Sequence, residues 1–125
     1  MNKVLVCGSR DWSDREVITR RIASFPLGTL IIHGGCRGAD TIAGEVAGEL
    51  GFGVVCFPAN WGEYGRGAGP RRNQAMIDEG KPDLVIAFHG DLASSRGTRD
   101  MVTRAAKCGI PVEVVTGRGD ESQQG

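Results

Sequence analysis

Arginine and glycine are the residue types whose number and placement in this chain point to a chemical function. Twelve of the 15 basic residues are arginines, and the planar guanidinium binds phosphate or carboxylate through two parallel hydrogen bonds. The chain also contains 20 glycines, and glycine allows the backbone to approach a ligand closely. Seven arginines lie in or next to four loops that each follow an apolar run: Arg10, Arg37, Arg66, Arg71, Arg72, Arg96 and Arg99.

Two glycine-containing turns, residues 34–38 and Gly97-Thr98, lead directly into segments with helical periodicity. The free N–H groups at the start of a helix bind phosphate. Neither turn matches the G-x-G-x-x-G dinucleotide fingerprint or the P-loop pattern, which argues against a dehydrogenase and a P-loop NTPase. We therefore predict a different phosphate-binding site, formed by Gly8, Ser9, Arg10, Gly34, Gly35, Arg37, Gly38, Asp40, Arg71, Asn73, Arg96, Gly97 and Thr98.

Aromatic residues and histidines occupy the same loops. Trp12, Trp61 and Tyr64 are placed either to stack on a base or to anchor their loops by burial. His33 and His89 each end an apolar run, and we interpret them as polar lining because no ligand partner stands at metal-binding spacing. We expect no metal and no cofactor.

Acidic residues and cysteines of these segments have simpler interpretations. Asp40 most simply caps the helix that follows the first turn. The four cysteines show neither CxxC nor Cys/His spacing, which argues against a disulfide framework or a zinc site. Their use as small apolar residues indicates a reducing compartment, and we predict a cytoplasmic protein.

Five short apolar runs alternate with segments of helical periodicity along the chain. Each run is almost continuously apolar, as in strands buried on both faces of a parallel sheet. The alternation predicts a single Rossmann-like α/β domain, with an open parallel sheet of about five strands and helices on both faces. In such a sheet the ligand binds where the strands end and their order reverses. The predicted strands are 3–7, 29–33, 53–58, 83–88 and 111–115, and the predicted helices are 13–25, 40–50, 70–79 and 97–108.

Local signals mark the ends of two predicted helices. Ser13 stands three residues before Glu16, which is the pattern of a capping box at the start of the first helix. Pro70 falls at the start of the third helix and Gly80 directly after its end, the positions that these residues prefer.

Size and charge limit the class of protein. A chain of 125 residues has room for one domain, which we assign to residues 1–116, and the polar segment 117–125 is predicted to be a disordered tail. No apolar run approaches the roughly 20 residues of a membrane span. The 15 acidic and 15 basic residues give a net charge of zero, which argues against a protein that coats nucleic acid.

Five short motifs follow one another along the chain. They are VLVCGSRDW at 4–12, IHGGxRGAD at 32–40, FPAxW at 57–61, GPxRNxxM at 69–76 and GTxDM at 97–101. In this order they resemble the YspA-related branch of the SLOG superfamily, which groups the Smf/DprA DNA-processing proteins with the Lonely Guy cytokinin-activating enzymes. The resemblance extends over residues 4–115 and implies a nucleotide-binding Rossmann-like domain with a small-molecule nucleotide as ligand.

The Lonely Guy enzymes are phosphoribohydrolases, which cut the N-glycosidic bond of nucleoside 5′-monophosphates. Arg72 and Met76 match their Arg-x-x-x-Met helix, and Asp100 stands where their Gly-Thr turn is followed by a catalytic Glu. The resemblance implies that Arg72 clamps phosphate or ribose and that Asp100 stabilises positive charge on the ribose as the bond breaks. The alternatives are a surface charge for Arg72 and a first-turn helix carboxylate for Asp100.

Three functions stay open on the sequence. The chain is a candidate phosphoribohydrolase, a non-catalytic sensor of a nucleotide-derived ligand, or a single-strand nucleic-acid protein resembling DprA. Acidic helix residues such as Glu45 and Glu49 argue against the third, since it needs a continuous basic track. Superfamily relatives dimerise through crossover helices, and helix 70–79 carries few apolar residues beyond Ala75, Met76 and Ile77. We expect a homodimer, because a small domain often completes its pocket across a two-fold axis, and no association with membranes.

Overall fold

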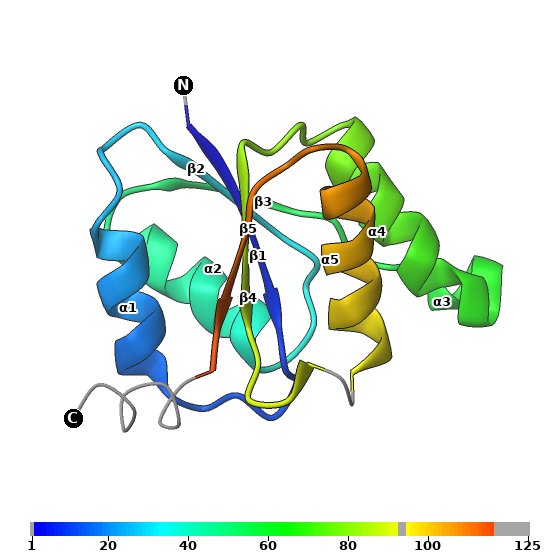
Figure 1. Ribbon diagram of the computed structural model, residues 1–125. Helices are drawn as coiled ribbons and strands as arrows, with labels where there is room; N and C mark the ends of the chain where they lie inside the picture. The colour runs from blue at the N-terminus through cyan, green and yellow to red at the C-terminus, as the bar shows by residue number, and fades with distance from the viewer. Residues whose placement is uncertain (1, 93–94, 117–125) are drawn as a thin grey trace.

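The computed structural model describes residues 2–92 and 95–116, and the predicted tail 117–125 lies outside the described residues. Five strands form one all-parallel sheet in the order β3-β2-β1-β4-β5 (Figure 1), which confirms the Rossmann-like α/β fold. The strands are β1 (Lys3–Gly8), β2 (Leu30–His33), β3 (Gly53–Cys56), β4 (Leu84–Phe88) and β5 (Val112–Val115). The helices are α1 (Arg15–Ala23), α2 (Ala39–Glu49), α3 (Trp61–Tyr64), the 3-10 turn η1 (Gly65–Gly67), α4 (Ala68–Asp78) and α5 (Arg96–Lys107).

The order of the strands reverses between β1 and β4. From β1 the chain builds outward through β2 to β3, then returns to place β4 on the other side of β1. The last residues of these two central strands, Gly8 and Phe88, are register partners. Because the connections after β1 and β4 leave toward opposite sides, a crevice is expected at the end of this strand pair.

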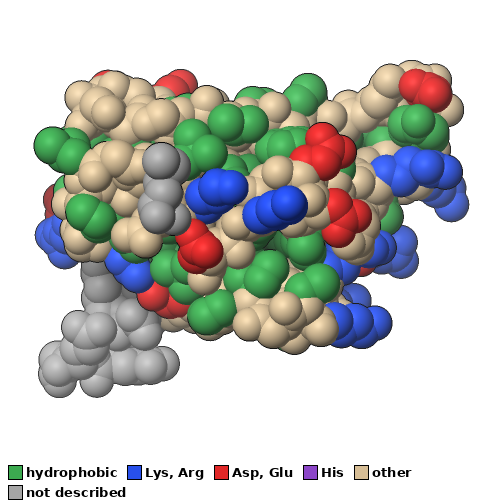
Figure 2. All heavy atoms as spheres, turned by 90° about the horizontal axis from the view of Figure 1, so that it is seen from above, with side chains coloured by type: hydrophobic (Ala, Val, Ile, Leu, Met, Phe, Trp, Pro, Cys, Tyr) green, Lys and Arg blue, Asp and Glu red, His purple; other side chains and the backbone are tan. Residues whose placement is uncertain are grey.

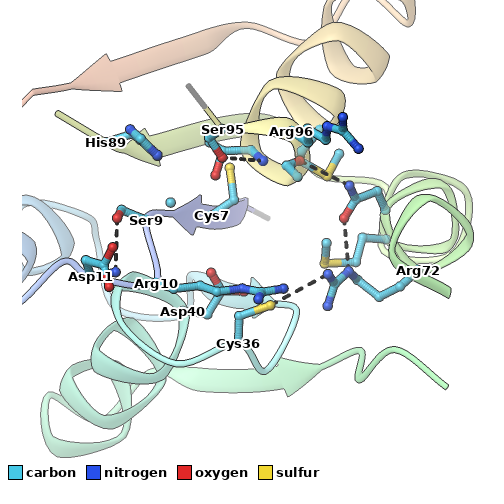
Figure 3. A pocket seen from close by; sticks show the side chains of 16 residues that line it. Cys7, Ser9, Arg10, Asp11, Cys36, Asp40, Arg72, His89, Ser95 and Arg96 are labelled. Atoms are coloured by element: carbon cyan, nitrogen blue, oxygen red, sulfur yellow. Dashed lines mark hydrogen bonds between the residues drawn. The ribbon is translucent and has the colours of Figure 1, made fainter. Parts of the chain in front are cut away.

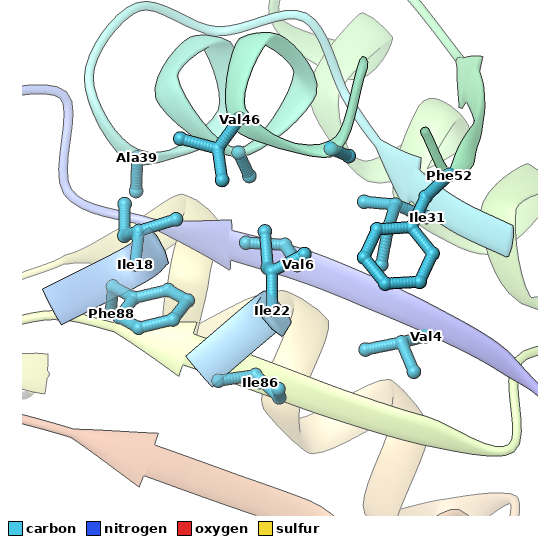
Figure 4. Packing of buried hydrophobic residues seen from close by; sticks show 12 residues of the cluster. Val4, Val6, Ile18, Ile22, Ile31, Ala39, Val46, Phe52, Ile86 and Phe88 are labelled. Atoms are coloured by element: carbon cyan, nitrogen blue, oxygen red, sulfur yellow. The ribbon is translucent and has the colours of Figure 1, made fainter. Parts of the chain in front are cut away.

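Helices cover both faces of the sheet, with α1 and α2 on one side and α4 and α5 on the other (Figure 1). The alternation of side chains along β1 serves both layers, since Val4 and Val6 belong to one hydrophobic cluster and Leu5 and Cys7 to the other. Figure 4 shows the first cluster, packed between the sheet and the helices α1 and α2. The double-sided core holds the ends of the central strands in fixed positions.

The outer strands correct the prediction that every strand is buried on both faces. All four residues of β3 are exposed, and Val54 and Val55 each keep 38% of their surface accessible. β3 is an edge strand with a neighbour on one side only. An apolar run predicts a strand but does not distinguish an edge position from a central one.

The start of α1 differs from the predicted capping box. The helix begins at Arg15, and the carboxylate of Asp14 accepts a hydrogen bond from the Val17 amide at 3.3 Å. The prediction that Ser13 caps this helix is therefore wrong, because Asp14 offers an equally good acceptor one residue later.

The region before and after α4 also differs from the prediction. Two short elements that were not predicted, α3 and η1, run directly into α4, so this helix begins at Ala68 rather than at Pro70. Gly80 follows the helix as predicted, but the left-handed conformation falls on Lys81, with φ of 49°. The amides of Glu79, Gly80 and Lys81 still donate to the carbonyls four residues earlier, at 2.8, 3.1 and 3.0 Å, which continues the helical hydrogen-bond pattern past Asp78. Among the described helices, none is long and apolar enough to cross a membrane.

Candidate functional site

A pocket of about 440 Å³ opens where β1 and β4 end side by side. It is enclosed by the loops after these strands, the starts of α2 and α5, and one side of α4 (Figure 3). Figure 2 shows the opposite edge of the sheet, where the strands begin and where acidic and basic side chains are interspersed. We call the cavity the first pocket, and its lining is Cys7, Gly8, Ser9, Arg10, Asp11, Cys36, Asp40, Arg72, Asn73, Met76, His89, Ser95, Arg96, Gly97, Thr98 and Met101.

Three arginines from three different elements line the first pocket. Arg10 follows β1, Arg72 comes from α4, and Arg96 is the first residue of α5. In Figure 3, Arg10 extends toward Arg72 on one side of the cavity, while Arg96 lies with the start of α5 on the other. Asp11 and Asp40 also line the pocket and balance part of the positive charge. The site therefore suits an anionic ligand that also carries hydrogen-bonding groups.

The guanidinium of Arg72 joins α4 to the turn after β2. Its Nη1 donates to the Gly34 carbonyl at 2.6 Å, and its Nε donates to Oδ1 of Asn73 at 2.9 Å. Its Nη2 lies 3.7 Å from the sulfur of Cys36. A guanidinium has five N–H donors, so these contacts fix the plane of Arg72 and still leave donors for a ligand.

Asn73 and Asp100 connect α4 to the start of α5. The Asn73 amide is buried, and its Nδ2 donates to Oδ2 of Asp100 at 2.9 Å and to the Gly97 carbonyl at 3.3 Å. The same Asp100 oxygen accepts from Nε of Arg104 at 2.8 Å. Asp100 is not part of the lining of the first pocket. In this structure it orients Asn73, which does line the pocket.

Asp40 is the buried carboxylate of the first pocket, with 5% of its surface exposed. The prediction that it caps α2 is wrong, because Gly38 occupies the N-cap position and Asp40 lies in the first turn. Its Oδ2 accepts from the Gly34 amide at 2.8 Å and so holds the turn after β2. Burial raises the pKa of Asp40 to about 6, against the opposing effects of the Gly34 hydrogen bond and the Arg72 charge. A carboxyl group of this kind exchanges protons near neutral pH.

Gly38 allows the loop after β1 to cross the start of α2. Its φ is +81°, and a Cβ at this position would lie 2.6 Å from the carbonyl carbon of Arg10. Next to it, the Ala39 amide donates to the Ser9 carbonyl at 3.0 Å. A side chain would push this loop away, so glycine is required for the close approach.

A second pocket of about 690 Å³ adjoins the first. Arg10, Cys36 and Arg72 line both cavities, so these side chains form the boundary between them. At the rim, Arg37 lies 3.9 Å from the carboxylate of Asp11, and both side chains are largely exposed. The remaining lining of the second pocket is Gly34, Gly35, Arg37, Pro58, Ala59 and Trp61.

The predicted site residues fall into three groups in the structure. Those that line the first pocket are Gly8, Ser9, Arg10, Asp40, Arg72, Asn73, Arg96, Gly97 and Thr98. Those that line only the second pocket are Gly34, Gly35 and Arg37. Those that line neither pocket are Gly38, Arg71 and Asp100, and the loop arginines Arg66 and Arg99.

Arg71 and the two histidines have environments of their own. The guanidinium of Arg71 stacks on the ring of Tyr64, 4.3 Å from its centroid.

His89 lines the first pocket, and its Nδ1 accepts from the Asp91 amide at 2.9 Å. His33 packs against α2, and burial lowers its pKa. In residues 2–92 and 95–116, no three His, Cys, Asp or Glu side chains gather in a way that could hold a metal ion.

Several lining residues were not identified from the sequence. Cys7 and Met76 belong to the hydrophobic core and also line the pocket. Their apolar periodicity in the sequence predicted only a core position. Burial raises the pKa of the Cys7 thiol, which keeps it neutral. Ser95 was also missed, although its hydroxyl accepts from the Thr98 amide at 3.2 Å and caps α5. A serine three residues before Thr98 was the available signal.

Fold and site together define a Rossmann-like α/β protein with an arginine-lined pocket at the point where the strand order reverses. The chain belongs to the YspA, cpYpsA-related SLOG family, whose model matches residues 2–64. The matched segment carries the loop after β1 and the turn after β2, whereas Arg72 and the start of α5 lie beyond it.

Two known proteins resemble the chain over most of its length. It is 40% identical over 121 residues to the Gene 61 protein of Mycobacterium phage D29, with 90% of this chain and 94% of the phage protein covered. Its fold is similar to that of DNA processing protein A (DprA) from Streptococcus pneumoniae, with a TM-score of 0.72 and 21% identity. That likeness covers 91% of this chain and half of the DprA chain. At this level of identity it shows a shared fold.

Proposed function

We propose that the first pocket binds the phosphate and ribose of a nucleotide. The observation that carries the proposal is the convergence of Arg10, Arg72 and Arg96 on one pocket at the strand-order reversal. Arg72 offers a guanidinium whose plane is already fixed by Gly34 and Asn73, so little freedom is lost when it binds an anion. Backbone amides at the start of α5 add donors beside Arg96.

Two side chains with oxygen acceptors could bind a ribose next to that phosphate. The carboxyl of Asp40 and the hydroxyl of Ser9 both line the pocket, and each can accept a hydrogen bond from a sugar hydroxyl. A pocket of about 440 Å³ lies within the range of roughly 300–1,000 Å³ that holds small ligands. Binding without turnover, as in a nucleotide sensor, needs nothing further.

A second candidate function is hydrolysis of the N-glycosidic bond. The observation in its favour is a carboxyl with a pKa of about 6, Asp40, in the same pocket as Arg72. Such a group can stabilise positive charge on the ribose when ionised or protonate the leaving base when neutral. Asp100, the carboxylate implied by the family resemblance, has its Oδ2 held by Asn73 and Arg104 and does not line the first pocket.

Titration calorimetry with AMP, CMP, GMP and UMP tests the binding proposal. Arg72→Ala should weaken binding by about 1.5–3 kcal/mol, the cost of a charge-assisted contact, and lysine should restore only part of it. Arg10→Ala should weaken binding without touching the Gly34 and Asn73 contacts. Arg71→Ala is the matched control, because this neighbouring arginine lines neither pocket. If no nucleotide binds, or if both pocket variants bind like the wild type, the proposal fails.

Chromatography for free base in the same samples separates the enzyme from the sensor. Base release that is lost in Asp40→Asn but kept in Asp100→Asn would assign the reacting carboxylate to Asp40, and the reverse pattern would assign it to Asp100. A nucleotide that binds and releases no base would exclude the hydrolase. A short single-stranded oligonucleotide serves as competitor, and its displacement of every mononucleotide at lower concentration would favour nucleic-acid handling instead.

A further inference from the structure

The second pocket contains an exposed aromatic ring that the proposed function does not use. Trp61 keeps 51% of its surface accessible and forms one wall of the cavity next to Pro58 and Ala59. Large aromatic side chains are usually buried, and an exposed one beside a cavity offers a flat surface to a ligand. At about 690 Å³ the cavity is large enough for a nucleoside of its own.

Local hydrogen bonds stabilise the short helix α3 that carries Trp61. Asn60 caps the short helix α3, since its Oδ1 accepts from the Glu63 amide at 3.1 Å and its Nδ2 donates to Glu63 at 3.0 Å. The edge of the indole ring lies against α4, where a Cβ on Gly69 would be 3.4 Å from it. The exposure of Trp61 is therefore built into an ordered turn, and the ring needs no rearrangement to stack on a planar group.

Another part of the second pocket's lining is the turn after β2, at Gly34 and Gly35. Gly35 adopts φ of +76°, and a Cβ there would lie 3.0 Å from the sulfur of Cys56. Nearby, the Phe57 amide donates to the His33 carbonyl at 2.8 Å. Glycine thus lets the turn approach the segment after β3 closely, which gives the second pocket a surface of peptide groups that suits the edge of a base.

The two pockets meet at the arginines that line both. Arg10 and Arg72 face the first pocket and also the second. If a phosphate bound between Arg10 and Arg72, one of its substituents could extend toward Asp40 and another toward Trp61. A ligand with groups on both sides of its phosphate would fill both pockets at once.

We propose that the second pocket stacks a nucleobase on Trp61, so that the preferred ligand is two nucleoside units joined through phosphate, one in each pocket. This inference rests on the proposed nucleotide site and extends it. Arg10 and Arg72 bind the linking phosphate, and Trp61 supplies stacking that tolerates any base. Because the second unit is tethered, its binding adds affinity without a new entropic cost of association.

Titration of the full chain with three probes tests this ligand class: AMP, a 5′–5′ linked diadenosine diphosphate, and a 3′–5′ linked adenine dinucleotide. At least one linked probe should bind roughly tenfold or more tightly than AMP, the scale of one stacked base. The better of the two linked probes identifies the linkage. Trp61→Leu should remove that advantage and leave AMP binding within about twofold, and Trp61→Phe should restore most of it, because a ring is again present.

Two controls make the result specific. Tyr64 is a second exposed aromatic residue of α3, and its side chain lines neither pocket. Tyr64→Leu should therefore leave the affinities for all three probes unchanged. In a Trp12→Phe background, Trp61 is the one remaining tryptophan, and its fluorescence should change with a linked probe.

The outcomes separate the two proposals. Equal affinity for AMP and both linked probes, or an unchanged advantage in Trp61→Leu, would overturn the second-pocket proposal and leave the nucleotide site intact. Absence of binding by all three probes to the wild-type chain would overturn both.

Discussion

Asp40 brings its carboxylate into the wall of the first pocket, where the surroundings control its proton affinity. Only 5% of the residue is exposed, and burial outweighs both the Gly34 hydrogen bond and the nearby charge of Arg72. The Asp100 side chain is 31% exposed and forms an ion pair with Arg104 at 2.8 Å. The two aspartates therefore differ in role although their side chains are identical. Asp40 can exchange a proton with a ligand, whereas Asp100 accepts a hydrogen bond from Asn73 and so orients that side chain.

Asp40 makes the stability of the protein depend on pH. Its folded pKa of about 6 exceeds the ordinary value of 3.8, so the folded state binds the proton more tightly and the free energy of unfolding falls as pH rises through this interval. Asp40→Asn keeps an oxygen acceptor for the Gly34 amide and removes the charge. We expect the wild type to lose up to about 3 kcal/mol more stability than Asp40→Asn when the pH is raised across this interval.

Urea denaturation of both proteins at several pH values measures this difference. Comparing the two chains cancels other titrating groups, including His33, whose lowered pKa has the opposite effect on stability. Parallel pH profiles for the wild type and Asp40→Asn would contradict the account of Asp40.

The start of α2 fixes the loop after β1, because Gly38 lies against the carbonyl groups of this loop. Gly38→Ala should lower the free energy of unfolding by about 1–3 kcal/mol, since φ of +81° strains any side chain and the Cβ meets Arg10. It should also weaken nucleotide binding, because the displaced loop carries Ser9 and Arg10. Thermal denaturation and calorimetry measure the two effects.

Gly48 provides the control within the same helix. It is exposed in α2, and a Cβ at this position would meet nothing within 4 Å. Gly48→Ala should therefore raise the free energy of unfolding by about 0.5–1 kcal/mol. If Gly38→Ala and Gly48→Ala behaved alike, the close approach at Gly38 would have no energetic importance.

The main elements of the fold were predictable because each has a strong local pattern. Continuous apolar runs identified all five strands, and the helices between them followed from their periodicity. The exposure of β3 was not predictable, since neither Val54 nor Val55 indicates how many neighbours the strand has. The helix α3 was also missed, because one turn is too short to show a periodic pattern.

The candidate site was predictable in its location but not in its contacts. Strand ends and helix starts placed Arg10, Arg72 and Arg96 at one edge of the sheet, and the first pocket lies there. The partners of Asp40 and Asp100 depend on the packing of α2, α4 and α5, and no local pattern encodes such tertiary contacts. Arg71 and Arg72 are neighbours in sequence, and only the helix rotation shows that one of them lines the pocket.

The fold limits which surfaces of the chain are available for self-association. The crossover helix α4 uses Met76 and Ile77 in the core of its own chain. Exposed apolar residues lie on both edge strands, at Val54 and Val55 of β3 and at Val114 of β5. The four cysteines are free thiols, and the cytoplasmic location stays a prediction.

We predict a homodimer in solution in which the β3 edge takes part, because an apolar edge strand readily pairs with another strand. Val55→Lys should shift the chain toward the monomer, since it adds a charge to this edge. Sedimentation velocity over a range of concentrations measures the equilibrium. A wild-type chain that stays monomeric at high micromolar concentration would remove the prediction.

A crystal structure of the chain with a bound nucleoside monophosphate would show whether the first pocket is the nucleotide site. We expect a phosphate in the first pocket, within hydrogen-bonding distance of the Arg72 guanidinium and near Arg10 and the start of α5, with the ribose toward Asp40. A nucleotide bound at saturation elsewhere on the protein, with the first pocket free of phosphate, would contradict this expectation.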